Sequence, residues 1–436
     1  MNPRSIAYRD TRAYLCGLTK MGIRFGLDPI NGLLGRLQDP QQRYPSVLIA
    51  GTNGKGSVAA MIAAILSAGG YRTGLYTSPD LIDFRERIRV DGEMISREEA
   101  TICAARVRAQ VREEISYFEF LTAMAFLHFR RRRVDIAVLE VGMGGRLDAT
   151  NVVVPLLAVI TNISLEHRQY LGDTLEAIAR EKGGIIKQGG RVLTAARQKP
   201  VVDTLDALCR DRNAELYRLG REIRTRVHRD GTFSYRGIGR RFARLTCPLV
   251  GRHQYANAAL ALGAVELIAD AGFPVPGDRV VAGLERTRWE GRLEVLRRAP
   301  TLLVDGAHNP AGAETLRRAL RENFSYRRLI LIFGVLGDKD YPAMARRLFP
   351  LADRVILTRP PSDRAVPLEE LLPIARRFHA AVEGYARPAD ALRAALSRAG
   401  ERDLVCAAGS LYLVGAIKKL QRAAARTGSI PGGAAR

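Results

Sequence analysis

Short apolar runs alternate with longer segments of helical periodicity along most of the chain. We expect strands at eight of these runs, namely YPSVLIA, VDIAVLEVG, LLAVITNI, GRVLTAA, TLLVDGA, RLILIFGVL, RVILTRP and LVCAAGS. Helical spacing separates them, for example at residues 57–68, 119–130, 173–180, 255–271 and 367–378. This alternation predicts an α/β fold in which crossover helices connect the strands of parallel sheets.

The same pattern indicates more than one domain. Residues 215–248 depart from it, because β-prone residues there surround Asp-Gly and Gly turns, which predicts antiparallel hairpins inserted in the first domain. A new series of strands and helices starts near residues 289–294, so we expect domains at 1–290 and 291–424. Residues 425–436 are rich in Gly, Ala and Pro and are expected to form a disordered tail.

Composition narrows the class of protein. The 436 residues are 47% hydrophobic and 26% charged, as in ordinary soluble proteins, and no apolar run approaches the roughly 18 residues of a membrane helix. Five scattered cysteines without CxxC spacing indicate a reducing setting, with no disulfide framework and no thiolate zinc site. The N-terminus lacks the apolar core of a secretory signal, so we expect a cytoplasmic protein without a membrane partner.

The net charge of +23 has two interpretations. A nucleic acid or another polyanion would account for it, but so would an arginine-rich host composition, since 60 of the 68 basic residues are Arg and they are scattered. The one tight cluster, Arg130 to Arg133, follows a helical segment, where cations suit the helix dipole. Small anionic ligands such as a nucleotide would absorb part of the excess.

The segment AGTNGKGS, residues 50–57, lies between an expected strand and an expected helix. Its glycines allow successive N–H groups to face an anion at a helix N-terminus. Lys55 would supply charge to the outer phosphates of a nucleotide, and Ser57 a hydroxyl for magnesium. Gly56 separates Lys55 from Ser57, unlike the usual motif, and a plain glycine turn is the alternative.

Other polar residues follow the ends of expected strands, where open α/β sheets bind their ligands. Glu140 ends one strand and would bind magnesium near the glycine loop, whereas Asp148 has the alternative of an ordinary turn former. His167 follows another strand, although a lone His is more often structural. Lys182 lies where a helix ends at two glycines, which requires no function.

Two further motifs, GRHQYANAALAL and LVDGAHNPAG, also carry candidate residues. Asn257 lies on the helix that the first motif opens. Asp305, His308 and Asn309 come together at the end of the strand in the second. Three polar side chains at one strand end are costly to bury without partners, so a ligand-facing loop is favoured.

The assembled motifs resemble the folylpolyglutamate synthase/dihydrofolate synthase family of the Mur ligase superfamily over nearly the whole chain. The segments that carry the resemblance include YLCGLTKMGIRFGLDPI, AGTNGKGS, YTSPDLIDFRERI, YFEFLTAMAF, EVGMGGRLDATN, ITNISLEHRQYLG, EKGGIIK, GRHQYANAALAL, GRLE, DGAHNPAG, FGVLGDKD and GSLYLVG. The family loop also has a Gly between Lys and Ser, so Gly56 fits it. The implied fold is a P-loop parallel-sheet ATPase domain of Mur ligase type and a smaller Rossmann-like C-terminal α/β domain.

The resemblance implies an ATP-dependent amide ligase. Such enzymes phosphorylate a pteroate or folate carboxylate to an acyl phosphate, which the amino group of L-glutamate then attacks. The implied cofactors are ATP and two magnesium ions, and the implied substrates are 7,8-dihydropteroate, reduced folates and L-glutamate. We expect the protein to be a monomer. Metal ions and cationic side chains would offset the charge of the anionic reactants.

Site roles follow from the matching positions. Gly54, Lys55, Gly56 and Ser57 would hold the ATP phosphates. The implied metal ligands are Ser57, Ser78 and Glu140 for one magnesium ion, and His167 for a second ion near Glu140. Lys182 matches a lysine that carbon dioxide carbamylates, which turns an ammonium that cannot bind metal into a carboxylate-like ligand.

The remaining implied roles concern ATP, glutamate and the pterin. Asn257, Arg292 and Asp305 match ATP-contacting positions, of which the last two belong to the hinge and the second domain. His308 and Ser410 match positions near the incoming glutamate. The implied pterin pocket comprises Phe25, Gly26, Tyr117, Phe118, Glu119, Leu147, Asp148 and Ala149.

Three positions depart from the family motifs: Asp80 replaces His, Glu166 replaces Asp and Glu290 replaces Pro. None of them is a phosphate or metal residue named above, but Asp80 bears on the pterin preference. We expect a bifunctional dihydrofolate and folylpolyglutamate synthase. The alternatives are a polyglutamate-only synthase, another Mur-type ligase and, from a different class, a basic nucleic-acid-binding NTPase. The NTPase is disfavoured because no nucleic-acid module is found.

Overall fold

The computed structural model describes residues 3–19, 22 and 26–427. The chain packs as two units. The first comprises residues up to 80, 84–248 and 254–288, and the second comprises 81–83, 249–253 and 289 onward. The backbone therefore passes between the units several times, and each unit is described by itself.

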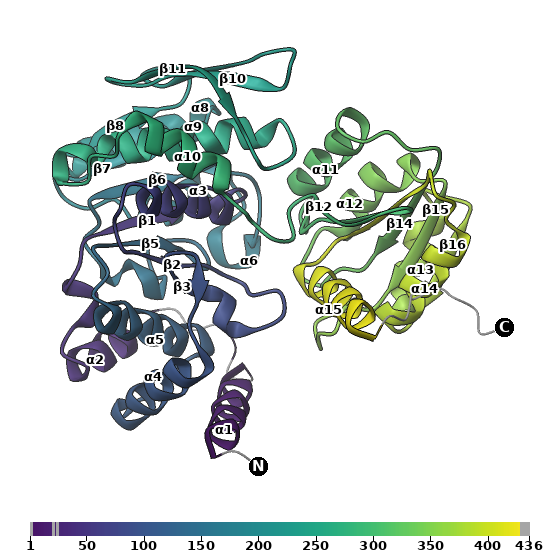
Figure 1. Ribbon diagram of the computed structural model, residues 1–436, viewed down its shortest axis with the longest axis horizontal. Coiled ribbons are helices and arrows are strands. Elements are labelled where there is room, and N and C mark those ends of the chain that lie inside the picture. The colour runs from purple at the N-terminus through teal and green to yellow at the C-terminus, as the bar shows by residue number, and fades with distance from the viewer. Residues whose placement is uncertain (1–2, 20–21, 23–25, 428–436) are drawn as a thin grey trace. The chain divides into compact units, whose positions relative to one another are not determined.

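The first unit contains an eight-stranded sheet in the order β4-β3-β2-β5-β1-β6-β7-β8 (Figure 1). Its strands are β1 (Ser46–Ala50), β2 (Thr73–Tyr76), β3 (Ile88–Val90), β4 (Glu93–Met94), β5 (Ile136–Glu140), β6 (Leu157–Ile160), β7 (Arg191–Thr194) and β8 (Glu215–Arg218). From β2 to β8 all pairings are parallel, and β3 and β4 add an antiparallel edge. The carboxyl ends of the parallel strands therefore meet at one edge.

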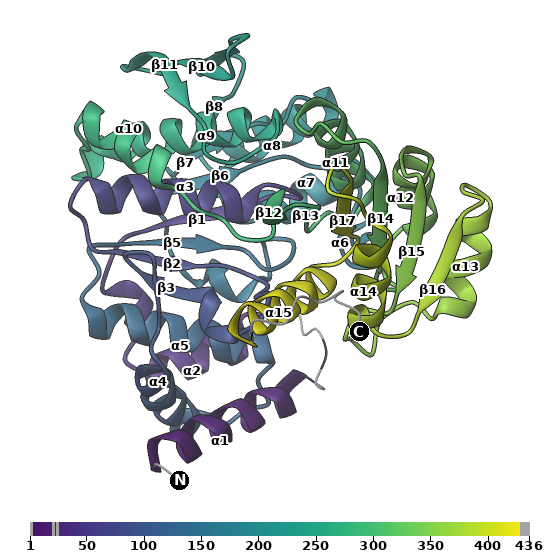
Figure 2. The ribbon, with the colours of Figure 1, turned by 45° about the vertical axis from the view of Figure 1, so that its right-hand side comes forward.

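Helices cover both faces of this sheet. They are α1 (Pro3–Leu18), α2 (Asp28–Arg36), α3 (Lys55–Ala68), α4 (Arg97–Gln110), α5 (Tyr117–Arg132), α6 (Arg168–Leu171), α7 (Leu175–Gly183), α8 (Lys199–Asp211), α9 (His253–Leu267) and α10 (Gly277–Arg286). Short 3₁₀ turns occupy Pro40–Gln42, Phe84–Arg87, Ala149–Val152 and Ala269–Ala271. Figure 2 shows α3, α9 and α10 on one side of the sheet and α2, α4 and α5 on the other.

Burial explains why the central elements are so apolar. All five residues of β1 and of β5 are buried, as expected for parallel strands covered on both faces. In α5 every residue from Glu119 to Phe129 is buried, so this helix has no solvent-facing stripe along that stretch. A capping box between Ser116 and Glu119 starts α5, and Arg133, at φ 50°, ends it in the left-handed conformation.

A three-stranded antiparallel sheet in the order β11-β10-β9 is inserted between β8 and α9. Its strands are β9 (Arg224–Val227), β10 (Thr232–Arg236) and β11 (Arg241–Thr246). The prediction of antiparallel hairpins is confirmed for this part. It is wrong for residues 215–218, which form β8 and pair in parallel with β7, because their alternating pattern does not reveal the direction of the partner strand.

The second unit has a six-stranded sheet in the order β12-β13-β17-β14-β15-β16. Its strands are β12 (Glu294–Arg298), β13 (Thr301–Val304), β14 (Leu329–Phe333), β15 (Arg354–Thr358), β16 (Val382–Tyr385) and β17 (Leu404–Ala408). Only β12 is antiparallel to its neighbour. The apolar residues of α11 (Pro310–Glu322), α12 (Tyr341–Leu348) and α13 (Leu368–Arg376) pack on one face, and those of α14 (Pro388–Arg398) and α15 (Leu411–Thr427) on the other. A 3₁₀ turn at Phe349–Leu351 follows α12.

The predicted α/β fold with parallel sheets and crossover helices is confirmed, and each of the eight predicted strands is present. The expected tail is wrong for residues 425–427, which belong to α15 because Ala and Arg favour helix. The remaining tail positions and Phe25 lie outside the described residues. Within the described part of the chain, no helix combines the length and apolar character needed to cross a membrane.

Candidate functional site

The glycine loop joins β1 to α3 at the carboxyl edge of the first sheet. Gly51 and Gly54 have φ values of 142° and 88°, which other residues rarely adopt. Lys55 is the first residue of α3, and its ammonium donates to the carbonyls of Gly51 (3.0 Å) and Thr52 (3.2 Å). Gly56 and Ser57 follow in the first turn, where backbone N–H groups lack intrahelical acceptors. The loop therefore has the geometry of an anion site at a helix N-terminus.

Residues at the end of β6 hold this loop in place. Thr161 donates from its hydroxyl to the carbonyl of Asn53 at 2.7 Å. The Asn162 amide both accepts from the backbone N–H of Asn53 (3.1 Å) and donates to its carbonyl (2.9 Å). Sequence reasoning missed Thr161 and Asn162 as supports of the loop. The available signal was that both polar residues directly follow an apolar strand.

Two close approaches explain why glycine is needed in the loop. A Cβ atom on Gly51 would lie 1.9 Å from the hydroxyl of Thr161. A Cβ atom on Gly54 would lie 2.7 Å from the amide oxygen of Asn257. Asn257 is buried in α9 and donates to Gln254 at 2.8 Å. The structure thus places Asn257 beside the glycine loop, although the two are about 200 residues apart in the sequence.

Glu140, the last residue of β5, lies at the same edge of the sheet. Strand β5 pairs with β1 so that Glu140 is opposite Ile49, directly before the loop. The Glu140 carboxylate is buried and accepts from the backbone N–H of Ser78 at 3.0 Å. Ser78 follows β2, which is the other neighbour of β5. Three adjacent strands therefore deliver Ser57, Ser78 and Glu140 to one edge.

This donor set fits a magnesium ion that a nucleotide helps to bind. Magnesium prefers oxygen ligands and commonly takes one or two carboxylates together with substrate phosphates and water. The described residues contain no group of three or more His, Cys, Asp and Glu side chains arranged to hold a metal. Glu140 and the hydroxyls of Ser57 and Ser78 supply oxygen donors, so the remaining ligands would come from phosphate and water.

Lys182, in the last turn of α7, is the most buried cation of this edge. Its side chain donates to the carbonyl of Gly51 at 2.9 Å and lies 2.7 Å from the carboxylate of Glu166. Burial lowers the pKa of Lys182, and the negative charge of Glu166 opposes this shift. Burial raises the pKa of Glu166, but the ammonium groups of Lys182 and Lys55 outweigh it and hold that pKa at about 2.

His167 follows Glu166 on the loop after β6. It adopts a left-handed conformation, with φ 44°, at the residue that precedes α6. A non-glycine residue in this region is uncommon, and such backbone outliers gather at functional sites. The structure thus places His167 on the loop that also carries Glu166, the partner of Lys182.

The residues expected to bind the pterin have diverse surroundings. Tyr117 stacks under the guanidinium of Arg87 at 5.2 Å, and the Phe118 ring lies 6.0 Å from that of Tyr76. The Glu119 carboxylate accepts from the backbone N–H (2.8 Å) and hydroxyl (2.6 Å) of Ser116. The structure gives Glu119 a role in capping α5, and the spacing SYFE already contained this signal.

The loop after β5 carries the other expected pterin residues. The Asp148 carboxylate accepts from the N–H of Met143 (3.0 Å) and from the N–H (3.0 Å) and hydroxyl (2.6 Å) of Thr150. Burial raises its pKa, and these hydrogen bonds oppose the shift. Asp148 therefore shapes the loop, while Leu147 is half-buried and Ala149 buried. Gly26 itself has a φ of 131°, a value that favours glycine.

In the second unit, Asp305 follows β13 and is buried. Its carboxylate accepts from the N–H of Leu293 (2.9 Å) and of Ala307 (2.8 Å). Burial raises the pKa of Asp305, and the positive charge of Arg292 opposes that shift. His308 Nδ1 lies 2.8 Å from the carbonyl of Gly306, which it meets as a donor. Asp305 thus anchors the turn that carries His308.

Other residues lie at the same edge of the second sheet. Asn309 caps α11 by accepting from the N–H of Gly312 at 2.7 Å. Ser410 follows β17, is buried, and accepts from the N–H of Tyr412 at 3.1 Å. Lys339 follows β14 and pairs with Asp338 at 2.8 Å. Lys339 and Ser410 follow neighbouring strands, because β14 lies beside β17 in the sheet, and this adjacency is not visible in the sequence.

The three positions that depart from the family motifs share one feature: each supplies a carboxylate to a basic side chain. Asp80 pairs with Arg87 at 2.6 Å, and Glu166 with Lys182 at 2.7 Å. Glu290 lies 2.8 Å from Lys418 and 3.2 Å from Arg422, both on α15. Each departure therefore has a structural partner within its own unit.

Comparison with known proteins gives consistent matches. Residues 49–265 match the Mur ligase middle domain, and residues 291–411 match the Mur ligase glutamate ligase domain. The dihydrofolate synthase/folylpolyglutamate synthase of Bacillus subtilis is 34% identical over 427 residues, which cover 95% of this chain and 99% of that protein.

Solved structures agree with the sequence matches. Folylpolyglutamate synthase of Mycobacterium tuberculosis in complex with ADP is 35% identical, with a TM-score of 0.88 over 96% of this chain and 99% of that one. A bifunctional folylpolyglutamate synthase/dihydrofolate synthase with manganese, AMPPNP and L-glutamate bound is 29% identical, with a TM-score of 0.85 over 94% and 98% of the two chains. The similarity therefore spans both units.

Proposed function

The chain belongs to the folylpolyglutamate synthase/dihydrofolate synthase family of Mur ligases, and on that premise we propose that it joins L-glutamate to dihydropteroate and to reduced folates at the expense of ATP. The observation that carries this proposal is the glycine loop, in which Lys55 and the N-terminus of α3 lie at the same sheet edge as Glu140. This arrangement supplies cationic and carboxylate groups together, as phosphoryl transfer requires.

The proposed reaction proceeds in two steps. The pteroate or folate carboxylate attacks the γ-phosphate of ATP, which releases ADP and leaves an acyl phosphate. The amino group of L-glutamate then adds to the acyl carbon, and the tetrahedral intermediate collapses to an amide and inorganic phosphate. Backbone N–H groups of Gly54 to Ser57 and the Lys55 ammonium would stabilise the charge on the transferred phosphoryl group.

Magnesium would offset the charge between the anionic reactants. We assign Ser57, Ser78 and Glu140 to one ion, and His167 to a second ion near Glu140. The oxygen donors and the burial of Glu140 support the first assignment. A related structure binds manganese with AMPPNP, which supports the use of a divalent metal together with a nucleotide.

We further propose that Lys182 is carbamylated in the active enzyme. Reaction with carbon dioxide needs a neutral amine, and burial lowers the pKa of Lys182, which favours that form. The product would be an anion next to Glu166, so a cation must accompany it. A carbamate at this position would therefore be expected together with bound metal.

Substrate roles are assigned by the same reasoning. The residues proposed to contact the pterin are Gly26, Tyr117, Phe118, Glu119, Leu147, Asp148 and Ala149, with Phe25 added from the sequence alone. Arg292 and Asp305, with Asn257, are proposed to contact the nucleotide. His308 and Ser410 are proposed to bind L-glutamate. We also propose that the enzyme acts as a monomer in the cytoplasm.

The test is an assay of ATP-dependent phosphate release with L-glutamate and one acceptor at a time. We expect release with 7,8-dihydropteroate and with tetrahydrofolate, and none when the acceptor or glutamate is omitted. Activity with tetrahydrofolate alone would leave the polyglutamate-only synthase as the function. Absence of release with either acceptor would refute the ligase assignment.

A further inference from the structure

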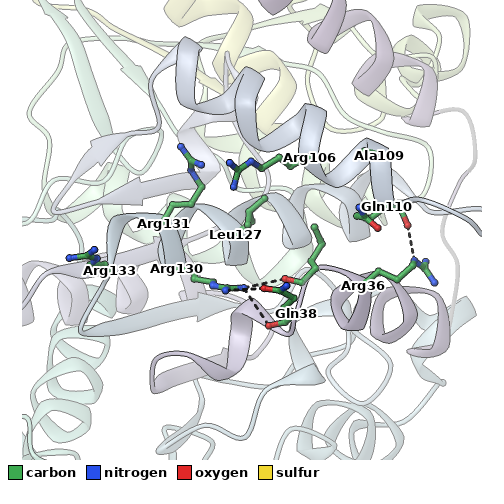
Figure 3. Close-up of a pocket in the computed structure, with 10 residues that line it drawn as sticks. Arg36, Gln38, Arg106, Ala109, Gln110, Leu127, Arg130, Arg131 and Arg133 are labelled. Carbon is green, nitrogen blue, oxygen red and sulfur yellow. Dashed lines mark hydrogen bonds between the residues drawn. The ribbon is translucent and has the colours of Figure 1, made fainter.

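A cavity of about 510 Å³ lies on the surface of the first unit, between helices α2, α4 and α5 (Figure 3). Half of its ten lining residues are arginines, and none of the ten is acidic. The arginines are Arg36, Arg106, Arg130, Arg131 and Arg133. We call these five residues the arginine cluster.

The cluster is a product of the fold. The run Arg130 to Arg133 was visible in the sequence and was explained by the dipole of the helix before it. The structure adds Arg36 from the end of α2 and Arg106 from α4, so three separate helices contribute to one cavity. Convergence from three helices is not explained by the dipole of one helix, which carries only about half a negative charge at its end.

Two of the five guanidinium groups already have partners. Arg36 donates to the carbonyl of Gln110 at 2.7 Å and to the Glu113 carboxylate at 2.9 Å. Arg130 donates to the carbonyl of Leu37 at 3.3 Å, and to the carbonyl and side-chain oxygen of Gln38 at 3.4 and 3.2 Å. Figure 3 shows Arg36 directed to Gln110 and Arg130 directed to Gln38. They form the fixed part of the wall.

The other three guanidinium groups, on Arg106, Arg131 and Arg133, form no hydrogen bond or ion pair with any residue that the structure describes. All three are exposed at the cavity. Three uncompensated positive charges around one hollow repel each other, and an anion bound there would remove that cost.

A second cavity of about 550 Å³ extends the basic surface. It shares Arg130 and Arg133 with the first and adds Arg43. Its one acidic residue, Asp135, accepts from the backbone N–H of Arg72 at 2.7 Å. The basic region thus extends over adjoining hollows, which gives room for a ligand with several anionic groups.

The cluster is remote from the glycine loop within the first unit. Arg133 and Asp135 precede β5, whereas Glu140 ends it. Five residues of extended strand span about 16 Å. The arginine cluster therefore lies at the amino end of the parallel strands and the glycine loop at their carboxyl end. The ligand of the cluster is therefore distinct from the nucleotide proposed for the glycine loop.

We propose that the arginine cluster binds a small anion carrying adjacent phosphate groups. The planar guanidinium group matches phosphate oxygens in pairs, and each phosphate brings up to two negative charges near pH 7. A short oligophosphate can therefore neutralise Arg106, Arg131 and Arg133 together. A chain of carboxylates carries one charge per group, so it needs more groups and a longer chain to supply the same charge.

Isothermal titration calorimetry of the full chain with inorganic tripolyphosphate tests the proposal. The test variant is Arg106→Glu/Arg131→Glu. The matched control is Arg229→Glu/Arg376→Glu, which changes the net charge equally at exposed positions away from the cavities. The glycine loop contributes its own binding equally in every variant, so the number of sites is the readout.

We expect the test variant to have one site fewer than the wild type, or at least about a tenfold weaker affinity at that site. The control is expected to match the wild type. The neutral pair Arg106→Gln/Arg131→Gln, which avoids charge reversal, should give an intermediate loss. Near-UV circular dichroism confirms that each variant is folded.

Equal loss in the control would show general charge attraction and would overturn the proposal, as would unchanged binding by the test variant. A second titration uses a tri-γ-glutamate peptide. Tighter binding of that peptide than of tripolyphosphate at the arginine cluster would overturn the assignment to phosphate. The titrations measure binding and not ligase turnover. A negative ligase assay would therefore not overturn the anion site, and a negative titration would not overturn the ligase assignment.

Discussion

The ammonium of Lys182 and the carboxylate of Glu166 form a buried ion pair at 2.7 Å, and the same ammonium donates to the carbonyl of Gly51 in the glycine loop. This relationship connects α7 and the loop after β6 to the proposed phosphate site. It also means that the lysine proposed to be carbamylated has a defined partner when unmodified. The side chains are 2% and 8% exposed, so water compensates neither charge.

Replacement of Lys182 tests its proposed role. We expect Lys182→Ala to lower kcat by about 10²-fold or more. The variant lacks the carbamate proposed to help bind the metal ion, so the negative charge of the transferred phosphoryl group would be less well offset. Added short carboxylates are expected to restore part of the activity. Wild-type rates in the variant would contradict the carbamate assignment.

The same replacement leaves Glu166 buried without its cation, which costs about 3–5 kcal/mol of unfolding free energy. The double variant Lys182→Ala/Glu166→Gln removes that charge and should regain most of the stability while remaining inactive. Lys199→Ala, at an exposed pair with Asp203, is the control and should change neither property. Urea unfolding and phosphate release measure the two effects.

Gly54→Ala should separate close approach from backbone strain. Gly54 and Gly70 have similar φ values, 88° and 95°, so an alanine at either costs about 1–2 kcal/mol of stability. Of the two, Gly54 is where the new Cβ collides, at 2.7 Å from Asn257, since no atom of the described residues lies within 4 Å of the corresponding Cβ at Gly70. We expect ATP affinity to fall at least about tenfold in Gly54→Ala and to stay unchanged in Gly70→Ala. Equal affinities in a nucleotide titration would argue against the loop as the phosphate site.

Asp80→Asn tests whether the departure at position 80 influences the pterin pocket. The substitution removes the negative charge that holds buried Arg87, which stacks over Tyr117. We expect a loss of about 1–3 kcal/mol in stability and a several-fold higher KM for the pteroate substrate, with a smaller change in kcat. Asp203→Asn, the same change at an exposed pair, should leave both values within error. An unchanged KM would show that Asp80 does not influence binding of the pteroate substrate.

His128→Leu should flatten the acid limb of the stability profile. His128 is buried in α5, its Nδ1 has no hydrogen-bond partner among the described residues, and burial lowers its pKa to about 4. In the unfolded chain this imidazole is therefore protonated as the pH falls through about 6.5, whereas in the folded chain it stays neutral until about pH 4. This contribution is fully present above pH 6.5 and declines by up to about 3 kcal/mol as the pH falls to 4. Chemical unfolding of both proteins from pH 8 to pH 4 measures the difference, and parallel curves would refute the assignment.

Local chemistry explains which parts of the site were predictable. The glycine loop is specified by eight consecutive residues, and Glu140 by the end of an apolar run, so both were predicted. In contrast, Lys182 was ambiguous, because its contact with Gly51 spans 131 residues. Glu119 was assigned to the pterin from the family pattern, and the structure adds that its carboxylate caps α5.

Strand order limited the rest in the same way. Apolar runs revealed eight strands, but β2, β3 and β4, with two to four residues each, were missed, as were the more polar edge strands β12 and β16. The arginine cluster could not be predicted either. Its members Arg36 and Arg106 are isolated in the sequence, and only the packing of α2 and α4 against α5 brings them to Arg131.

The place of β17 in the second sheet bears on how the protein is made. This strand lies between β13 and β14, yet it follows all the other strands of its sheet along the chain. On the ribosome, β13 and β14 have to wait for about 70 further residues beyond β14 before the strand that joins them has been synthesised, a delay of some seconds at typical elongation rates. Until then their buried edges are unpaired. Nascent chains stalled before β17 should therefore be the form that chaperones and proteases recognise.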